Sequence, residues 1–198
     1  MDQFGGFSAI QKVEVDLITD AYRVSGTVQT RFGRVTDILN QLTAAHLVVE
    51  QATITEHADP SAALSAPSAL IDLTSILVLS APGLTGTASA EMRIPKRAVK
   101  AQFALPPIRV AGTIHVPMGS RPLDGLLNVT DRFVAMTDAT ISSGAHPELA
   151  GTAGAVAISR ARAQILLVAD DDRPEELLAD VLDERTAEAW LHADEAPG

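Results

Sequence analysis

Cysteine is absent from this chain of 198 residues. Disulfides, thiolate nucleophiles and cysteine-based zinc or iron–sulfur sites are therefore excluded. Aromatic residues are also few, with five Phe, one Tyr and one Trp, so a core must be packed mainly from Val, Ile, Leu and Ala. No apolar run approaches the roughly 18 residues of a membrane span, and residues 1–7 lack the basic and apolar regions of a secretion signal. We expect a cytoplasmic protein with no membrane span.

Common catalytic and cofactor motifs are missing as well. The sequence contains no Gly-x-x-x-x-Gly-Lys-Ser/Thr phosphate loop, no Gly-x-Ser-x-Gly nucleophile turn and no His-Glu-x-x-His zinc motif. We therefore predict no catalytic residue and no cofactor, and a protein that is not an enzyme.

Acidic residues outnumber basic ones, with 25 Asp and Glu against 15 Lys and Arg. Most of the surplus lies in residues 171–198, which contain ten acidic residues and two arginines, so the rest of the chain is nearly neutral. Asp172 can cap a helix that begins near Pro174. We expect this helix to cover a sheet edge of its own chain rather than to recruit a foreign partner. Its apolar stripe recurs at helical spacing: Leu177, Leu178, Val181, Leu182, Ala189 and Trp190.

What the chain does contain is a repeated pattern. Arg23-Val24-Ser25-Gly26-Thr27-Val28 recurs as Arg109-Val110-Ala111-Gly112-Thr113-Ile114. His46-Leu47-Val48-Val49 then corresponds to Phe133-Val134-Ala135-Met136, and Ile76-Leu77-Val78-Leu79 to Ile165-Leu166-Leu167-Val168. This self-similarity predicts a tandem of two like domains. Because a repeat of about 60 residues is marginal alone, we expect the copies to pack together or with other subunits.

The hydrophobic pattern of both copies is that of strands. Val13, Val15 and Leu17 alternate with polar residues ahead of the first copy. Gly26 and Gly112 fall at the same place in two matched strands, which predicts a bulge or sharp bend in each. The expected fold is mainly β: two tandem small β-barrel or sandwich-like repeats plus a C-terminal acidic amphipathic α-helix. The predicted divisions are an N-terminal strand extension at 1–20, repeat 1 at 21–82, a linker at 83–106, repeat 2 at 107–170 and the acidic helix and tail at 171–198.

Shorter features repeat within the two copies. Residues 34–40 and 122–128 each predict a short helical turn closed by Asn, a residue that tolerates the left-handed conformation at a helix end. Leu39 and Leu127, just before these asparagines, are predicted core anchors. Residues 57–68 and 142–152 are rich in small and polar residues and are expected to form exposed loops.

The second copy resembles a bacterial domain family of unknown function. The resemblance is carried by Thr137-Asp138-Ala139 at the end of a strand and by Val156-Ala157-Ile158-Ser159-Arg160 in the closing hairpin. The first copy departs from it, with Glu50-Gln51-Ala52 in place of Thr-Asp-Ala. The resemblance spans both repeats, excludes the acidic tail and implies no reaction. The order of five strands is also similar to that of small Sm-like barrels, an analogy of fold alone.

One set of residues has the chemistry of a metal site. His57 and Asp59 lie in the loop of the first copy, and His146 and Glu148 lie at the corresponding place in the second. A pseudo-twofold arrangement would bring two imidazoles and two carboxylates together as ligands. Exposed loop residues are the simpler interpretation, and no metal is predicted. His46 corresponds to Phe133 and is interpreted as a packing residue.

Basic residues provide the sites that we consider for an anionic ligand. A nucleic-acid interface needs a basic face with aromatic stacking platforms, whereas this chain is nearly neutral outside its acidic tail and its aromatic residues are scattered. Nucleic acid is therefore a less favoured partner than protein. The candidate cations are Arg93, Lys96, Arg97, Lys100, Arg160 and Arg162.

These observations favour a non-catalytic structural or protein-interaction protein. Like domains present like edges, and like edges pair into symmetric assemblies. We therefore expect a homo-oligomer that works through protein contacts. A binding module for nucleic acid or another anionic ligand is the first alternative, and a metal-dependent site is the second.

Overall fold

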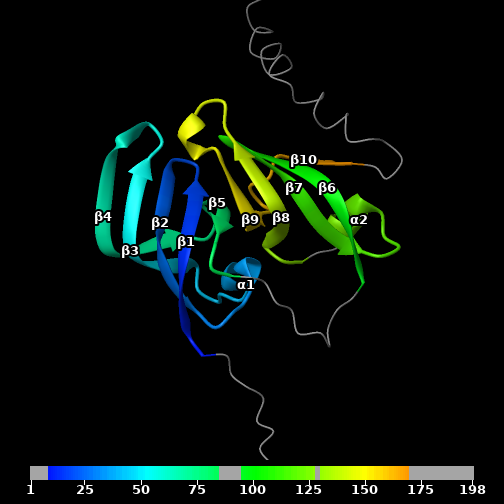
Figure 1. Ribbon diagram of the computed structural model, residues 1–198, viewed down its shortest axis with the longest axis horizontal. Coiled ribbons are helices and arrows are strands. Elements are labelled where there is room, and N and C mark those ends of the chain that lie inside the picture. Colours follow the sequence, from blue (N-terminus) through cyan, green and yellow to red (C-terminus); the bar gives the residue numbers. More distant parts are fainter. Residues whose placement is uncertain (1–8, 85–94, 128–129, 170–198) are drawn as a thin grey trace, which may run out of the picture.

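The computed structural model describes residues 9–84, 95–127 and 130–169, which fold into one antiparallel sheet of ten strands with short helices (Figure 1). The prediction of a mainly β protein is confirmed. The helices are α1 (Val35–Asn40), α2 (Pro122–Leu127) and the 3-10 turn η2 (Pro147–Leu149). The strands are β1 (Gln11–Thr19), β2 (Tyr22–Thr30), β3 (His46–Glu56), β4 (Asp59–Asp72), β5 (Ile76–Ser80), β6 (Lys96–Leu105), β7 (Ile108–Pro117), β8 (Phe133–Ser142), β9 (Gly151–Ser159) and β10 (Ile165–Val168).

The sheet has the strand order β10-β6-β7-β8-β9-β5-β1-β2-β3-β4. We call β1 to β5 the first half and β6 to β10 the second half. The first half pairs in the order β5-β1-β2-β3-β4 and the second in the order β10-β6-β7-β8-β9. The halves meet where β5 pairs with β9, at the centre of Figure 1.

Within the described residues, two hydrophobic clusters form the interior, one in each half. The first core includes Leu17, Leu39 and Leu79, and the second includes Phe103 and Ile114. Some side chains cross between the halves. Phe133 and Ala157 of the second half belong to the first core, whereas Ile18, Leu77 and Val78 of the first half belong to the second core. The two halves therefore share their interiors and are not independently packed.

Gly26 and Gly112 lie at irregularities in the strand pairing, as predicted. The register between β2 and β3 shifts between Ser25 and Thr27, and the register between β7 and β8 shifts between Ala111 and Thr113. A Cβ at Gly26 would lie 2.7 Å from the Glu50 carbonyl oxygen, and one at Gly112 would lie 2.7 Å from that of Thr137. Only glycine allows the two backbones to approach so closely.

A matching backbone feature lies on the strand opposite each glycine. Gln51 on β3 and Asp138 on β8 both adopt a φ of 51°, in the left-handed region. Residues other than glycine adopt this conformation uncommonly, at a cost of order 1–3 kcal/mol. Both bulges therefore combine a close approach at a glycine with a left-handed residue on the neighbouring strand.

The predicted helical turn of the first half is α1, and Leu39 on it is fully buried. The expected left-handed Asn at its end is wrong, because Asn40 is itself the last helical residue of α1, and Gln41 after it has a φ of −89°. Asn40 instead hydrogen-bonds across to β8: its side-chain amide donates to the Phe133 carbonyl at 2.9 Å, and its Oδ1 accepts from the Phe133 N–H at 2.9 Å. In the second half α2 lies where the other turn was expected, while Asn128 and the side chain of Leu127 lie outside the described residues.

Two segments that were expected to be peripheral are strands with a partner on both sides. Residues 96–105 of the predicted linker form β6, which pairs with both β7 and β10 and buries Val99, Phe103 and Leu105. The strand β1, expected to be an extension, lies between β2 and β5. Pro95 and Pro106 made residues 96–105 resemble a connection, although the alternation of buried and exposed residues between them is that of a strand.

The loop expected at 57–68 is also mostly strand. β4 begins at Asp59 and pairs with β3 along its length. Ala and Ser have little preference for strands, but the pairing with β3 overrides that preference. The second expected loop, at 142–152, agrees with the structure over residues 143–150, which hold η2 between β8 and β9. The acidic helix predicted at 171–198 lies outside the described residues.

Candidate functional site

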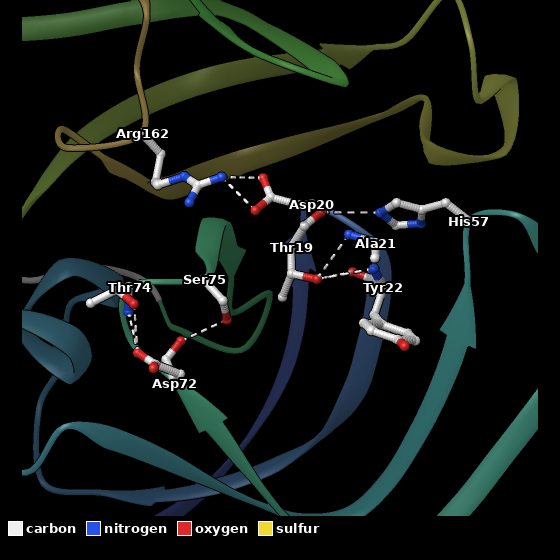
Figure 2. Close-up of polar contacts among 9 residues, drawn as sticks. All are labelled: Thr19, Asp20, Ala21, Tyr22, His57, Asp72, Thr74, Ser75 and Arg162. Atoms are coloured by element: carbon white, nitrogen blue, oxygen red, sulfur yellow. Dashed lines mark hydrogen bonds and ion pairs between the residues drawn. The ribbon is translucent and has the colours of Figure 1, made fainter.

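The two histidines of the predicted metal set lie together. The ring centroids of His57 and His146 are 5.3 Å apart, with His57 after β3 and His146 before η2. His57 is buried, and its Nε2 lies 3.0 Å from the Thr19 carbonyl oxygen (Figure 2). His146 Nδ1 is 3.3 Å from Glu148 Oε1. The structure thus places side by side the two imidazoles that the sequence pattern matched.

The fourth member of that set does not join them. Asp59 is exposed and its Oδ1 accepts hydrogen bonds from the Ser61 hydroxyl at 2.6 Å and from the Ser61 N–H at 3.2 Å. These bonds lower the pKa of Asp59. Within residues 9–84, 95–127 and 130–169, no group of three His, Cys, Asp or Glu side chains is placed to hold a metal ion. The histidine pair is instead a packing contact between the turn after β3 and the loop after β8.

The predicted anion-binding cations are dispersed and largely engaged by the protein itself. Arg162 donates to both carboxylate oxygens of Asp20 (Figure 2). Arg160 donates to the Asp131 carbonyl at 3.4 Å, and Arg97 donates to the Ser120 carbonyl at 3.2 Å. Lys96 and Lys100 are exposed on β6, while Arg93 lies outside the described residues. Three arginines that were candidates for an anionic ligand therefore help to hold turns and strands in place.

A shallow groove of about 600 Å³ crosses the outer face of β1, β2 and β3 at the Gly26 bulge. Its charged residues are Glu14, Asp16 and Arg23. Arg23 donates to both carboxylate oxygens of Asp16, at 3.0 and 2.7 Å, and this pairing raises the pKa of Arg23. An arginine that is always charged cannot transfer protons at neutral pH, and no histidine lines the groove. The groove offers polar contacts around this arginine–carboxylate pair.

The outermost strands have an unusual surface. Among the described residues, β4 pairs only with β3, and β10 pairs only with β6. Leu70 on β4 is 70% exposed, and Ile165 on β10 is 57% exposed. Sheet edges present unpaired N–H and C=O groups, and soluble proteins commonly protect them with charge, proline or a covering element. Apolar residues on two such edges make them the strongest candidate interaction sites of the described molecule.

Asn40 and Arg132 join the two halves through hydrogen bonds, a role that the sequence did not predict for either residue. Arg132, just before β8, donates to the carbonyls of Leu39 at 2.9 Å and Leu42 at 2.7 Å, next to the Asn40 contact with Phe133.

The expectation that His46 packs inside is wrong, because His46 is exposed at the start of β3. Phe133, which the sequence pattern matched to His46, is buried in the first core.

Comparison of the chain with protein-family models, with curated proteins and with solved structures found no match. None of the helices within the described ranges combines the length and apolarity required to cross a membrane. The case for function therefore depends on the geometry of the molecule itself.

Proposed function

We propose that this chain is a non-catalytic structural or protein-interaction protein, built from two copies of one five-stranded unit, that associates with itself through the edges of its sheet. Three similarities between the halves support the duplication. Their strands pair in the same order, each has a register shift at a matched glycine, and Gln51 and Asp138 share the same left-handed φ.

The observation that carries the proposal is the contrast between central and outer strands. At the centre, Val78 on β5 is 1% exposed and Ala157 on β9 is 0% exposed. In the strand order of its own half, β10 occupies the place that β5 has in the other half, and β4 occupies the place of β9. These outer strands nevertheless carry exposed Ile165 and Leu70. Apolar edge strands lower their free energy by pairing with another strand, which supplies hydrogen-bond partners and removes apolar surface from water.

The test is the mass of the full chain in solution. Light scattering after size-exclusion chromatography, from about 1 to about 200 µM protein, should give a mass that rises with concentration above the 20.8 kDa of one chain. Because apolar burial and backbone pairing are screened little by salt, the association should persist in about 0.5 M NaCl. A mass of one chain at every concentration would contradict the proposal. Loss of association in salt would point to charge contacts instead.

A further inference from the structure

The strands β10 and β4 end the strand order of the described sheet. Building on the proposed function, we propose that β4 of one molecule pairs with β10 of a second copy of this chain, antiparallel and head-to-tail. This contact reproduces between molecules the β5–β9 junction that already joins the halves within one molecule. The proposal depends on which strands are equivalent, on how the internal junction is packed, and on what the outer edges expose.

The pairing of the strands identifies which strand of one half is equivalent to which strand of the other. Gly26 pairs with Val15 on β1, and Gly112 pairs with Ala101 on β6, so β1 corresponds to β6. Two positions further along these strands, Leu17 on β1 corresponds to Phe103 on β6. Leu17 pairs with Leu79 on β5, and Phe103 pairs with Leu166 on β10, so Leu79 corresponds to Leu166. This differs by two residues from the match of Ile76 with Ile165 that the sequence favoured. The strand β10 is therefore the counterpart of β5.

The other edge is assigned in the same way. Glu50 pairs with Thr27 across the first bulge and Thr137 pairs with Thr113 across the second. Three residues before these positions, Leu47 on β3 corresponds to Val134 on β8. Leu47 pairs with Ile71 on β4, and Val134 pairs with Ile158 on β9. The strand β4 is therefore the counterpart of β9, with Ile71 at the place of Ile158.

At the internal junction each strand contributes a side chain to the core of the other half. The paired residues are Val78 with Ile158, Leu79 with Ala157 and Ser80 with Val156. Val78 belongs to the second core although it lies in the first half. Ala157 belongs to the first core although it lies in the second half. The junction is thus buried on both faces of the sheet.

The outer edges expose the counterparts of these two exchanged residues. Ile165 corresponds to Val78, and Leu70 corresponds to Ala157. Within one molecule each of them faces away from its own core, which accounts for their exposure of 57% and 70%. Their neighbours Leu166 and Ile71 pack against the cores of their own halves, as Leu79 and Ile158 do at the junction. Each edge therefore has one side chain directed inward and one that remains available for a neighbouring core.

The register of the internal junction predicts the register between molecules. Ile165 of one copy should lie opposite Ile71 of the next, Leu166 opposite Leu70, and Leu167 opposite Ala69. All six residues are apolar, so no like charges oppose each other. The two edges are different surfaces at opposite ends of the strand order, which makes the contact heterologous. Such contacts generate a ring when the rotation closes and a filament when it does not.

Two charged substitutions test the pairing because each blocks one edge. Leu70→Lys places a charge on β4, and Ile165→Lys places one on β10; both positions are more than half exposed, so the fold should be retained. Each variant alone should associate only at a protein concentration at least tenfold higher than the parent needs, because a lysine would have to be buried in a neighbouring core. Leu64→Lys on β4, outside the three predicted pairs, and Leu123→Lys on α2 are matched controls that should associate like the parent.

Mixing the two blocked variants is the decisive measurement. The Leu70→Lys chain keeps its β10 edge and the Ile165→Lys chain keeps its β4 edge, so an equimolar mixture should form a heterodimer of two chains and no larger species. Labelling one variant and measuring mass by sedimentation distinguishes this heterodimer from either variant alone. Self-dimers of the Ile165→Lys chain would overturn the proposal in favour of β4 pairing with β4. A mixture that stays monomeric while the parent associates would place the contact elsewhere, and a monomeric parent would contradict the proposed function itself.

Discussion

At the residue scale, Gly26 and Gly112 determine how closely two pairs of strands approach. Each glycine faces a backbone carbonyl oxygen 2.7 Å from the position of a Cβ, and Val49 or Met136 crowds the same space. The pattern in the sequence was sufficient to predict these bulges. It gave no indication of the left-handed φ of Gln51 and Asp138 opposite them, because the preference of Gln and Asp for that conformation is too weak to predict it from the residue type.

We expect Gly26→Ala and Gly112→Ala each to lower the free energy of unfolding by about 1–3 kcal/mol, since the new methyl group must displace a backbone carbonyl. Urea denaturation followed by circular dichroism measures the effect. Gly33→Ala is the matched control, because a Cβ there meets no atom within 4 Å. This control should be neutral or slightly stabilising. Equal stability of all three variants would show that the close approach is relieved at no cost.

Asn40 also has its role at this scale, as a side chain that satisfies both backbone groups of Phe133. Asn40→Ala should lower the free energy of unfolding by about 1–3 kcal/mol, because it leaves a partly buried N–H and C=O without their partners. Asn40→Asp keeps the acceptor for the N–H and places a carboxylate against the carbonyl. It should therefore be more stable at pH 3 than at pH 7 relative to the parent. An Asn40→Ala variant with parental stability would mean that water replaces the amide.

At the scale of elements, α1 carries a carboxylate that is unfavourably placed. Burial raises the pKa of Asp37, as does the charge of Asp131, while Arg34 opposes the change. A folded-state pKa above the unfolded value contributes stability below the unfolded pKa, and that contribution is lost as the pH rises through the folded pKa. The ionised form at neutral pH is therefore a cost to the folded state.

Asp37→Asn removes this cost. The free energy of unfolding of the variant, relative to the parent, should rise between pH 3 and pH 7, which urea titrations at several pH values measure. Asp59→Asn is an informative comparison, because hydrogen bonds from Ser61 lower the pKa of Asp59. That variant should lose stability relative to its parent over the same range. Parallel pH profiles for both variants would contradict these assignments.

Sequence reasoning succeeded for elements whose own residues determine their form. The alternation of β1, β2 and β7 and the apolar spacing of α1 were sufficient to predict them. It failed for β4 and for β6, where Ala, Ser and flanking prolines indicated loops and a linker. The open edges could not be predicted, because the exposure of Leu70 and Ile165 depends on which strands end the sheet. That order is a property of long-range pairing.

At the scale of the whole molecule, the exchange of side chains between the cores predicts that the described halves unfold together. Leu39 in the first core and Leu105 in the second are both fully buried. Leu39→Ala and Leu105→Ala should each cost about 2–5 kcal/mol and lower the midpoint of one shared transition. Differential scanning calorimetry measures this through the agreement of calorimetric and van't Hoff enthalpies. Two separated peaks in either variant would show that the halves are independent.

The shared interiors also govern how the chain can fold while it is being made. β1 to β5 leave the ribosome first, but the first core is complete only when Phe133 and Ala157 have arrived. Until then Leu77 and Val78, whose final place is the second core, have no partners from the later half. Incompletely packed apolar strands of this kind are what chaperones bind. The half that is synthesised first must therefore wait for the half that is synthesised last.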